Sequence, residues 1–240
     1  MSRPDPLVSI VIAVYNGERH LQEALASIEA QTFSNWEILL CDDGSTDGSD
    51  LIVAEACRSP RVHSLPGRHQ GVAAARNRGV AASQGQLIAF LDQDDRWAPH
   101  KLERQVALLD EQPSAGFSLA RQRVFVDDEG DWPPWAPREW TEEDMLVYIP
   151  GVLMARRELF DESRVGLFDT SYINTSDSDW IFHATDLGIP RVDVDEVLLH
   201  KRIHPHNASR KIEINRAELF RALRRSVRRR RAQAQDCGPE

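Results

Sequence analysis

Residues 87–97 read LIAFLDQDDRW, an apolar run followed at once by three aspartates, Asp92, Asp94 and Asp95. The apolar run predicts a buried strand. Carboxylates this close together repel one another unless a cation lies between them. Hard oxygen ligands of this kind suit Mg²⁺ or Mn²⁺, which share their coordination shell with phosphates. The stretch therefore predicts a strand that ends in a metal site or, in its plainer interpretation, in a solvated acidic turn that caps the next helix.

Strands and helices alternate around this stretch. Apolar runs predict strands at residues 7–14, 36–41, 61–65 and 87–91. Helical spacing and capping residues predict helices at residues 18–31, 50–57, 71–83 and 99–111. This order is typical of an α/β fold with a doubly wound, mostly parallel sheet, in which ligands bind at the carboxyl ends of the strands. We therefore expect three polar loops to share one edge of the sheet: residues 15–17, 42–44 and 92–95.

The second half of the chain has a looser pattern. It predicts strands at residues 115–126 and 191–199, the latter at a sheet edge, and helices at residues 156–160, 177–187 and 216–231. Residues 127–140 are rich in proline, tryptophan and acid, which predicts a loop or lid. Trp132, Trp135 and Trp140 either stack on a bound sugar or peptide or hold this loop against the body.

The charge of the chain is uneven. Residues 216–240 hold eight arginines and three acids, and the net charge of −9 leaves −14 on residues 1–215. The acidic body argues against nucleic acid as a partner. The basic tail is a candidate for peripheral contact with an anionic membrane, or for pairing with the acidic body or with a second subunit in a homodimer.

The ends of the chain and its cysteines bear on localisation. The first residues, MSRPDPLVSIVIAVYN, read as the approach to a strand rather than a secretory leader. No apolar run reaches the roughly 18 residues of a membrane span. Cys41, Cys57 and Cys237 match no zinc spacing and are expected to be reduced thiols. We therefore expect a cytoplasmic protein, with the tail as a candidate for contact with the inner face of the membrane.

Four blocks of sequence resemble the family 2 glycosyltransferases of GT-A fold. They are VSIVIAVYNGERHLQEALASIEAQTFSNWEILLCDDGSTDGS, GVAAARNRGVAASQGQLIAFLDQDDRWAPHKLERQ, VGLFDTSYINTSDSDWIFHATDLG and LLHKRIHPHNAS. The similarity covers roughly residues 6–210, and the first two blocks are the most specific. The resemblance implies a single GT-A domain over residues 1–215, with a nucleotide-binding half (1–112) and an acceptor-binding half (113–215), followed by the basic tail (216–240).

The resemblance also implies roles for particular residues. Tyr15 would stack near the uracil of a nucleotide donor, and Asp43 would hydrogen-bond that ring. The whole donor set is Ala13, Tyr15, Asp43, Arg76, Asn77, Asp92 and Asp94. Mn²⁺ or Mg²⁺ would be held by the DxD-type element and a later histidine, that is by Asp94, Asp95 and His204, with Asp95 as the main contact. The acceptor or the diphosphate would meet Gly151, Asp179, Trp180 and Arg202.

The implied catalytic base is Asp177, in a position where the family usually has Glu-Asp and this chain has Ser176-Asp177. Asp179 is the alternative, but two residues further along a helix it would point elsewhere.

The implied reaction is a metal-dependent, inverting transfer of a sugar from a nucleotide sugar, with a UDP-sugar favoured. The acceptor hydroxyl can belong to a glycan, a lipid-linked sugar, a small molecule, or a peptide or protein. Two alternatives remain. A nucleotidyltransferase has a similar sheet but needs a glycine-rich, basic loop after the first strand, where this chain has Tyr15-Asn16-Gly17-Glu18. A catalytically weak binding module would have lost the aspartates or the base.

Overall fold

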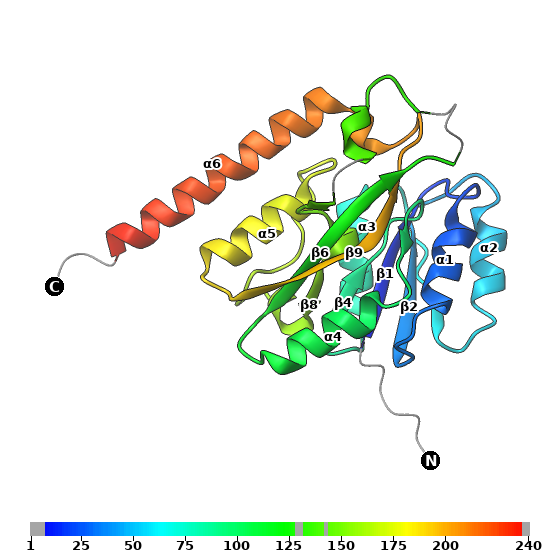
Figure 1. Ribbon diagram of the computed structural model, residues 1–240, viewed down its shortest axis with the longest axis horizontal. Helices are drawn as coiled ribbons and strands as arrows, with labels where there is room; N and C mark the ends of the chain where they lie inside the picture. The colour runs from blue at the N-terminus through cyan, green and yellow to red at the C-terminus, as the bar shows by residue number, and fades with distance from the viewer. Residues whose placement is uncertain (1–7, 128–131, 142–143, 237–240) are drawn as a thin grey trace, which may run out of the picture.

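The computed structural model describes residues 8–127, 132–141 and 144–236 of the chain. Its first half is the expected alternation of strands and helices, with β1 in the middle of four parallel strands (Figure 1). β1 reads VSIVIAV, and this β-branched run is buried on both faces, as a central parallel strand requires. The elements of this half are β1 (Val8–Val14), α1 (Leu21–Glu29), β2 (Trp36–Asp42), α2 (Ser49–Ala56), β3 (Val62–Ser64), α3 (Val72–Ala82) and β4 (Leu87–Phe90).

The second half extends the same sheet but makes it mixed. The strand order is β3-β2-β1-β4-β8-β6-β9-β5, with β7 paired to β6. β8 is antiparallel to β4 and β6, and β5 is antiparallel to β9, whereas β6 and β9 are parallel. The strands are β5 (Arg96–Trp97), β6 (Phe117–Phe125), β7 (Met145–Leu146), β8 (Met154–Arg156) and β9 (Arg191–Arg202).

One expectation about the sheet is confirmed and one is wrong. The sheet is mostly parallel, because β1–β4 and the long pair β6–β9 are parallel, and β5, β7 and β8 add only short antiparallel pairs. These strands have two or three residues each, too few for a period-2 pattern to reveal them. The strand expected at an edge, residues 191–199, is β9, which lies between β6 and β5.

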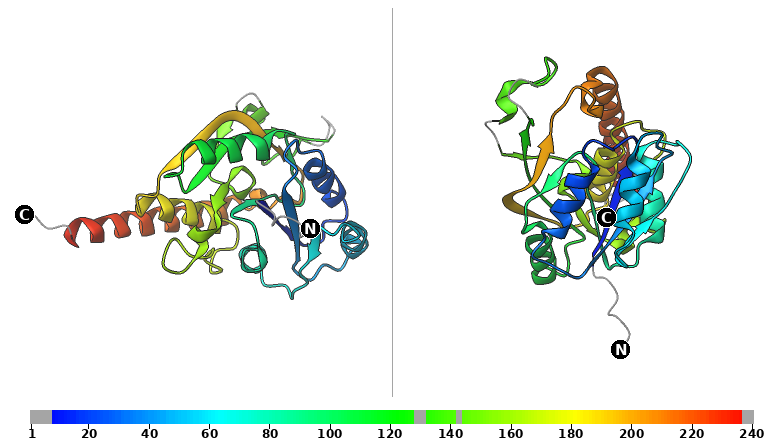
Figure 2. Two further views of the ribbon diagram at one scale, coloured as in Figure 1. Left: turned by 90° about the horizontal axis from the view of Figure 1, so that it is seen from below. Right: turned by 90° about the vertical axis from the view of Figure 1, so that its right-hand side faces the viewer.

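The helices of the second half are α4 (Lys101–Glu111), α5 (Ser176–Asp186) and α6 (Ile212–Asp236), with 3₁₀ turns η2 (Arg138–Thr141), η3 (Pro150–Val152), η4 (Arg157–Phe160) and η5 (Ala208–Arg210). The helix expected at residues 156–160 is the single turn η4. α6 begins four residues earlier than expected, lies along α5, and projects beyond the body of the molecule (Figures 1 and 2).

One acid, Asp186, makes the shortest polar contacts between α5 and α6. Asp186 of α5 accepts hydrogen bonds from Ser226 (2.7 Å), Arg229 (2.8 Å) and Arg230 (2.7 Å) of α6. The inner arginines of the tail therefore pair with the acidic body. None of the helices in the described ranges has the length and apolarity needed to cross a bilayer.

Candidate functional site

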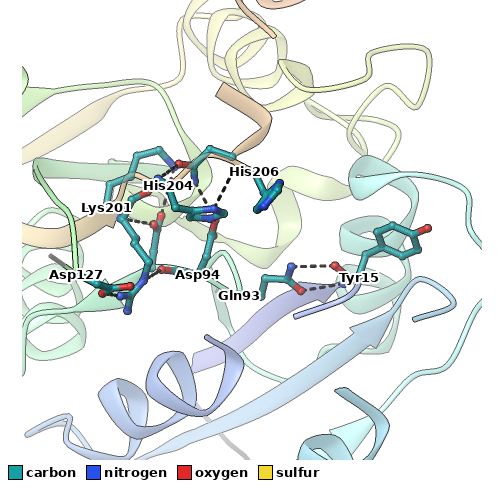
Figure 3. Close-up of polar contacts among 10 residues, drawn as sticks. Tyr15, Gln93, Asp94, Asp127, Lys201, His204 and His206 are labelled. Atoms are coloured by element: carbon teal, nitrogen blue, oxygen red, sulfur yellow. Dashed lines mark hydrogen bonds and ion pairs between the residues drawn. The ribbon is translucent and has the colours of Figure 1, made fainter. Parts of the chain in front are cut away.

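The loops that follow β1, β2 and β4 lie together at one edge of the sheet, which confirms their predicted convergence. The Tyr15 backbone N–H donates to Gln93 Oε1 (2.8 Å), and Gln93 Nε2 donates to the Tyr15 carbonyl (2.9 Å; Figure 3). The Asn16 N–H donates to Ser45 Oγ (3.0 Å), and the Thr46 N–H donates to Asn16 Oδ1 (2.8 Å). Asn16 has φ 50°, a conformation that asparagine tolerates better than most residues.

An exposed aromatic ring and a buried carboxylate lie side by side at this edge. The Tyr15 ring stacks on His69, with 4.2 Å between the ring centroids. His69 Nδ1 is 3.1 Å from Asp43 Oδ2, and Asp43 also accepts the backbone N–H groups of Gln70 and Gly71. Ala13 is half-buried at the end of β1 beside this group. An aromatic face next to a carboxylate suits a flat, nitrogen-rich base. Neither His69 nor Gln93 was singled out by the sequence analysis, although Gln93 belongs to the predicted loop of residues 92–95.

The three aspartates after β4 point toward three different partners. Asp92 Oδ1 accepts a hydrogen bond from Arg76 Nη2 (2.6 Å), and the Arg76 side chain is buried. Asp94 Oδ2 is 3.0 Å from His204 Nε2 and accepts a hydrogen bond from Asn207 Nδ2 (3.0 Å; Figure 3). Each of these carboxylates thus has its own hydrogen-bond donor, and these donors offset the repulsion between the carboxylates.

Asp95 is the innermost of the three aspartates. Its Oδ1 accepts the Arg202 backbone N–H (2.8 Å), and its Oδ2 is 3.5 Å from Lys201 Nζ. Burial, with the charges of Asp94 and Asp92, raises the pKa of Asp95 to about 8 although Lys201 acts to lower it. The Asp95 side chain has no exposed surface. Asp95 therefore joins the loop to β9, and the geometry does not fit its predicted role as the main metal contact.

Asp94 and His204 form a pair that is more exposed than Asp95, with 20% and 16% of their side chains exposed. Burial acts to raise the pKa of Asp94, but the hydrogen bond with His204 and the charge of Lys201 hold it below its usual value. In the part of the chain that the structure describes, no three acidic, imidazole or thiol side chains converge as a complete metal site. One carboxylate and one imidazole nevertheless fit a cation that takes its other ligands from substrate phosphates and water.

Arg202 is buried, and its guanidinium group binds other groups of the protein. Its Nη2 donates to Glu23 Oε2 (2.5 Å), its Nε donates to the Asp94 carbonyl (2.9 Å), and its guanidinium also pairs with Asp127. Only 1% of its side chain is exposed. The structure therefore does not present Arg202 to a diphosphate, as the sequence predicts, but places it behind the Asp94 loop.

Asp177 and Asp179 lie on different sides of α5. Asp179 pairs with Arg225 (3.4 Å) and Arg229 (3.7 Å) of α6, so it faces away from the strand-end loops. Asp177 is buried, and the charges of Arg76 and Asp92 act on it. Burial raises the pKa of Asp177 to about 6, with Arg76 acting to lower it. Asp177 is thus the α5 carboxylate on the same side as the strand-end loops.

Three other residues predicted for the site make internal packing contacts or hydrogen bonds. The Asn77 amide exchanges two hydrogen bonds with the Phe168 backbone (2.8 and 2.9 Å). The Gly151 carbonyl accepts the Trp97 indole N–H (2.9 Å), and a Cβ at this glycine would lie 2.7 Å from Leu199. Trp180 is buried, stacks on Phe160 and donates its indole N–H to the Gly166 carbonyl (2.8 Å). The structure therefore does not bring these three residues to the edge where the polar loops meet.

Comparison with known proteins identifies the family of the chain. Residues 9–164 match the model of the family described as glycosyl transferase family 2. The chain is 41% identical over 106 residues to WfgD of Escherichia coli, a UDP-Glc:alpha-D-GlcNAc-diphosphoundecaprenol beta-1,3-glucosyltransferase. That alignment spans 44% of this chain and 42% of WfgD, so the chain matches less than half of that relative's length.

Two solved structures share the fold over most of the chain. The mannosyltransferase PcManGT from Pyrobaculum calidifontis, in complex with GDP-Man and Mn²⁺, superposes with a TM-score of 0.74 at 20% identity, over 93% of this chain and 64% of that one. TarS 1-349 of S. aureus, in complex with UDP-GlcNAc, superposes with a TM-score of 0.73 at 18% identity, over 92% of this chain and 66% of that one. The fold is therefore GT-A. The family match covers more than half of the chain, and the chain belongs to glycosyl transferase family 2.

Proposed function

We propose that this glycosyltransferase is metal-dependent and inverting, and that it moves a sugar from a UDP-sugar to an acceptor hydroxyl with Asp177 as the base. The observation that carries the proposal is the position of Asp177. It is a buried carboxylate whose pKa is raised to about 6, and it lies within the electrostatic reach of Arg76 and Asp92, next to the strand-end loops. A base poised near the working pH is what general-base catalysis requires.

Each residue of the site has a defined part in this reaction. Tyr15 and Asp43 bind the uracil ring. Asp92 contacts the donor, and Arg76 holds the Asp92 carboxylate in place. Asp177 accepts the proton of the acceptor hydroxyl as its oxygen attacks the anomeric carbon. The bond from that carbon to the diphosphate oxygen breaks, and the electron pair leaves with the nucleoside diphosphate. Attack opposite the leaving group inverts the anomeric centre.

Asp94 and His204 are the residues that would hold a divalent cation, Mn²⁺ or Mg²⁺. A cation bound there would neutralise negative charge on the departing diphosphate. PcManGT, a structural neighbour, holds Mn²⁺ together with its nucleotide sugar, which supports metal use in this fold. The loop after β1 is Tyr15-Asn16-Gly17-Glu18, without the basic, glycine-rich sequence that a triphosphate-binding nucleotidyltransferase needs, so the transferase is favoured over that alternative.

The donor can be identified by ligand-dependent stability. The full chain would be heated with UDP-, GDP- and dTDP-sugars in the presence of Mn²⁺, Mg²⁺ or EDTA. A ligand at 100 times its Kd stabilises the folded state by about 2.7 kcal/mol. We expect one UDP-sugar to raise the Tm by several degrees with metal and by much less with EDTA. Equal Tm values with every nucleotide sugar and metal would contradict the proposed donor site.

The outward face of α6 is a candidate for contact with anionic lipid. Phe220, Leu223 and Val227 are exposed on it. Arg224, Arg228 and Arg231 are also exposed, and no carboxylate in the described ranges pairs with them. Apolar side chains flanked by arginines are typical of helices that lie at a membrane surface, although they can also pack against a second subunit.

Vesicle sedimentation distinguishes these two uses of the helix. Each basic residue near an anionic surface contributes about 1 kcal/mol, so the variant with Arg224→Gln, Arg228→Gln and Arg231→Gln is expected to bind anionic vesicles roughly 100-fold more weakly. A variant with Arg58→Gln, Arg157→Gln and Arg164→Gln, which removes the same charge from exposed positions outside α6, is the matched control. Unchanged vesicle binding would refute lipid contact, and a concentration-dependent mass in light scattering would favour the homodimer instead.

A further inference from the structure

A pocket of about 580 Å³ lies beside the candidate metal residues and is not used in the mechanism above. Its lining is the WPPW stretch of residues 132–135, together with Pro205, Arg210 and Lys211. Pro205 follows directly on His204, whose imidazole contacts Asp94. In Figure 1 the stretch after β6 lies next to the loop between β9 and α6, so the pocket joins two segments far apart in sequence.

The aromatic wall of this pocket is held in place by its own contacts. Trp132 donates its indole N–H to the Ala136 carbonyl (2.7 Å), and Trp135 packs edge-on against Trp140. The three tryptophans pack on a small cluster formed by Val124, Ala136 and Ile203. This arrangement holds the loop against the body, one of the two roles expected for these residues. It also leaves Trp132 and Trp135 as walls of the pocket, where indole rings offer flat apolar surface to a sugar ring.

One polar group of the aromatic wall has no partner. The Trp135 indole nitrogen is buried and finds no acceptor within the described ranges. Buried indole N–H groups almost always donate a hydrogen bond, because leaving one unpaired costs free energy. This nitrogen has no surface open to the pocket, so its missing hydrogen bond is a cost of packing the loop and not a contact for a ligand.

The remaining wall of the pocket is basic. Arg210 donates from Nη1 to the Pro205 carbonyl (3.2 Å) and is otherwise exposed. The Lys211 ammonium is exposed, and no carboxylate in the described part of the chain pairs with it. Arginine and lysine side chains that have no carboxylate partner are suited to bind phosphate oxygens. This pair stands out in a body whose net charge is strongly negative.

We infer that this pocket binds the acceptor, and that the acceptor is a sugar bearing a phosphate or diphosphate ester. The sugar ring packs against Trp132 and Trp135, and the phosphate lies against Arg210 and Lys211. Because the pocket adjoins His204, a sugar held there has its hydroxyl groups close to the donor site. This inference rests on the proposed transferase function and specifies its acceptor class. The phosphate can belong to a free sugar phosphate or to a lipid-linked sugar diphosphate.

The test separates the acceptor pocket from the donor site. The full chain would first be titrated with UDP and Mn²⁺, and UDP binding would be recorded by calorimetry. With UDP saturating, three probes would follow: N-acetylglucosamine 1-phosphate, the decyl diester of N-acetylglucosamine 1-diphosphate, and methyl N-acetylglucosaminide. We expect a phosphorylated probe to bind at least about tenfold more tightly than the neutral glycoside, because hydrogen bonds to charged groups are among the strongest. Tighter binding of the decyl probe would identify a lipid-linked source, and equal binding a free sugar phosphate.

Matched variants locate the binding. Arg210→Gln with Lys211→Gln should weaken the phosphorylated probe by at least about tenfold. Arg157→Gln with Arg164→Gln, which removes the same charge from exposed positions outside the pocket and α6, should change it by no more than about twofold. Trp132→Ala, which removes one aromatic wall of the pocket, should weaken every sugar probe. Equal affinity for phosphorylated and neutral probes, or equal loss in both double variants, would overturn the inference. Failure of UDP itself to bind would instead refute the proposed donor site.

Discussion

Asp177→Asn is expected to reduce turnover by about 10²–10⁴-fold, the usual contribution of a general base, while the affinity for the donor changes little. The reason is that Asp177 lies on the side of α5 that faces Arg76 and Asp92, where it can accept the proton of the acceptor. Asparagine has nearly the same shape but cannot accept a proton. The measurement is the rate of nucleoside diphosphate release beside the Kd of the donor.

Asp179→Asn is the matched control for this prediction. The variant removes a carboxylate two residues away that pairs with Arg225 and Arg229, so it should weaken the packing of α6 and leave turnover nearly intact. A large loss of turnover in Asp179→Asn with normal activity in Asp177→Asn would exchange the two assignments.

The pH dependence provides a second readout of the same base. Burial raises the folded-state pKa of Asp177 to about 6, and only the unprotonated carboxylate can accept a proton. Wild-type turnover should therefore rise as the pH increases toward about 6 and level off above it. The residual activity of Asp177→Asn should lack this rise. A variant with the same ascending limb would show that another group is responsible.

Asp94→Ala and His204→Ala are each expected to abolish the difference that Mn²⁺ makes to UDP binding. In the proposed site one carboxylate and one imidazole would be the protein's ligands, so removing either would leave a single ligand. Loss of a residue that hydrogen-bonds a metal ligand typically lowers metal affinity by about 10–100-fold, and loss of the ligand itself lowers it at least as much. Calorimetric titration of UDP with Mn²⁺ and with EDTA measures the effect.

Asp95→Ala serves as the contrast to these two variants. It leaves Lys201, which is 85% buried, without its carboxylate partner. Above a pH of about 8, where Asp95 is ionised, breaking this buried ion pair from one side costs about 3–5 kcal/mol, so the Tm is measured there. We therefore expect Asp95→Ala to lower the Tm strongly, and Asp94→Ala to lower it little. Loss of the metal effect in Asp95→Ala at an unchanged Tm, with normal behaviour of Asp94→Ala, would return the main metal contact to Asp95.

The nucleotide-binding half could be predicted because local sequence and tertiary structure agree there. The run VSIVIAV is apolar on both faces, and the loops after β1, β2 and β4 begin where apolar runs stop. Parallel strands then force those loops to one edge, so the neighbourhood of Tyr15, Asp43 and Asp92 follows from topology. Similar reasoning cannot find β5, β7 and β8, whose few residues pair only because longer strands already lie beside them.

The direction of individual side chains could not be read from the sequence. The spacing of Asp92, Asp94 and Asp95 predicts a shared cation, yet each has a separate partner, and that of Asp95 is Lys201, 106 residues further along the chain. The resemblance implies that Arg202 meets a diphosphate, but its pairing with Glu23 depends on β5, which lies between α1 and β9. The separation of Asp177 from Asp179 was expected from helical periodicity, and the structure adds the reason, which is that α6 supplies arginines for Asp179 alone.

The most direct test of the central claim, single displacement from a nucleotide sugar at this site, is the anomeric configuration of freshly transferred sugar. The chain would be incubated with its preferred α-linked UDP-sugar and Mn²⁺, and the first product, formed with acceptor or with water, would be followed by ¹H NMR before mutarotation. The account predicts a β-configured product that Asp177→Asn forms far more slowly. An α-configured first product would contradict it, because retention cannot arise from one in-line attack assisted by a single base.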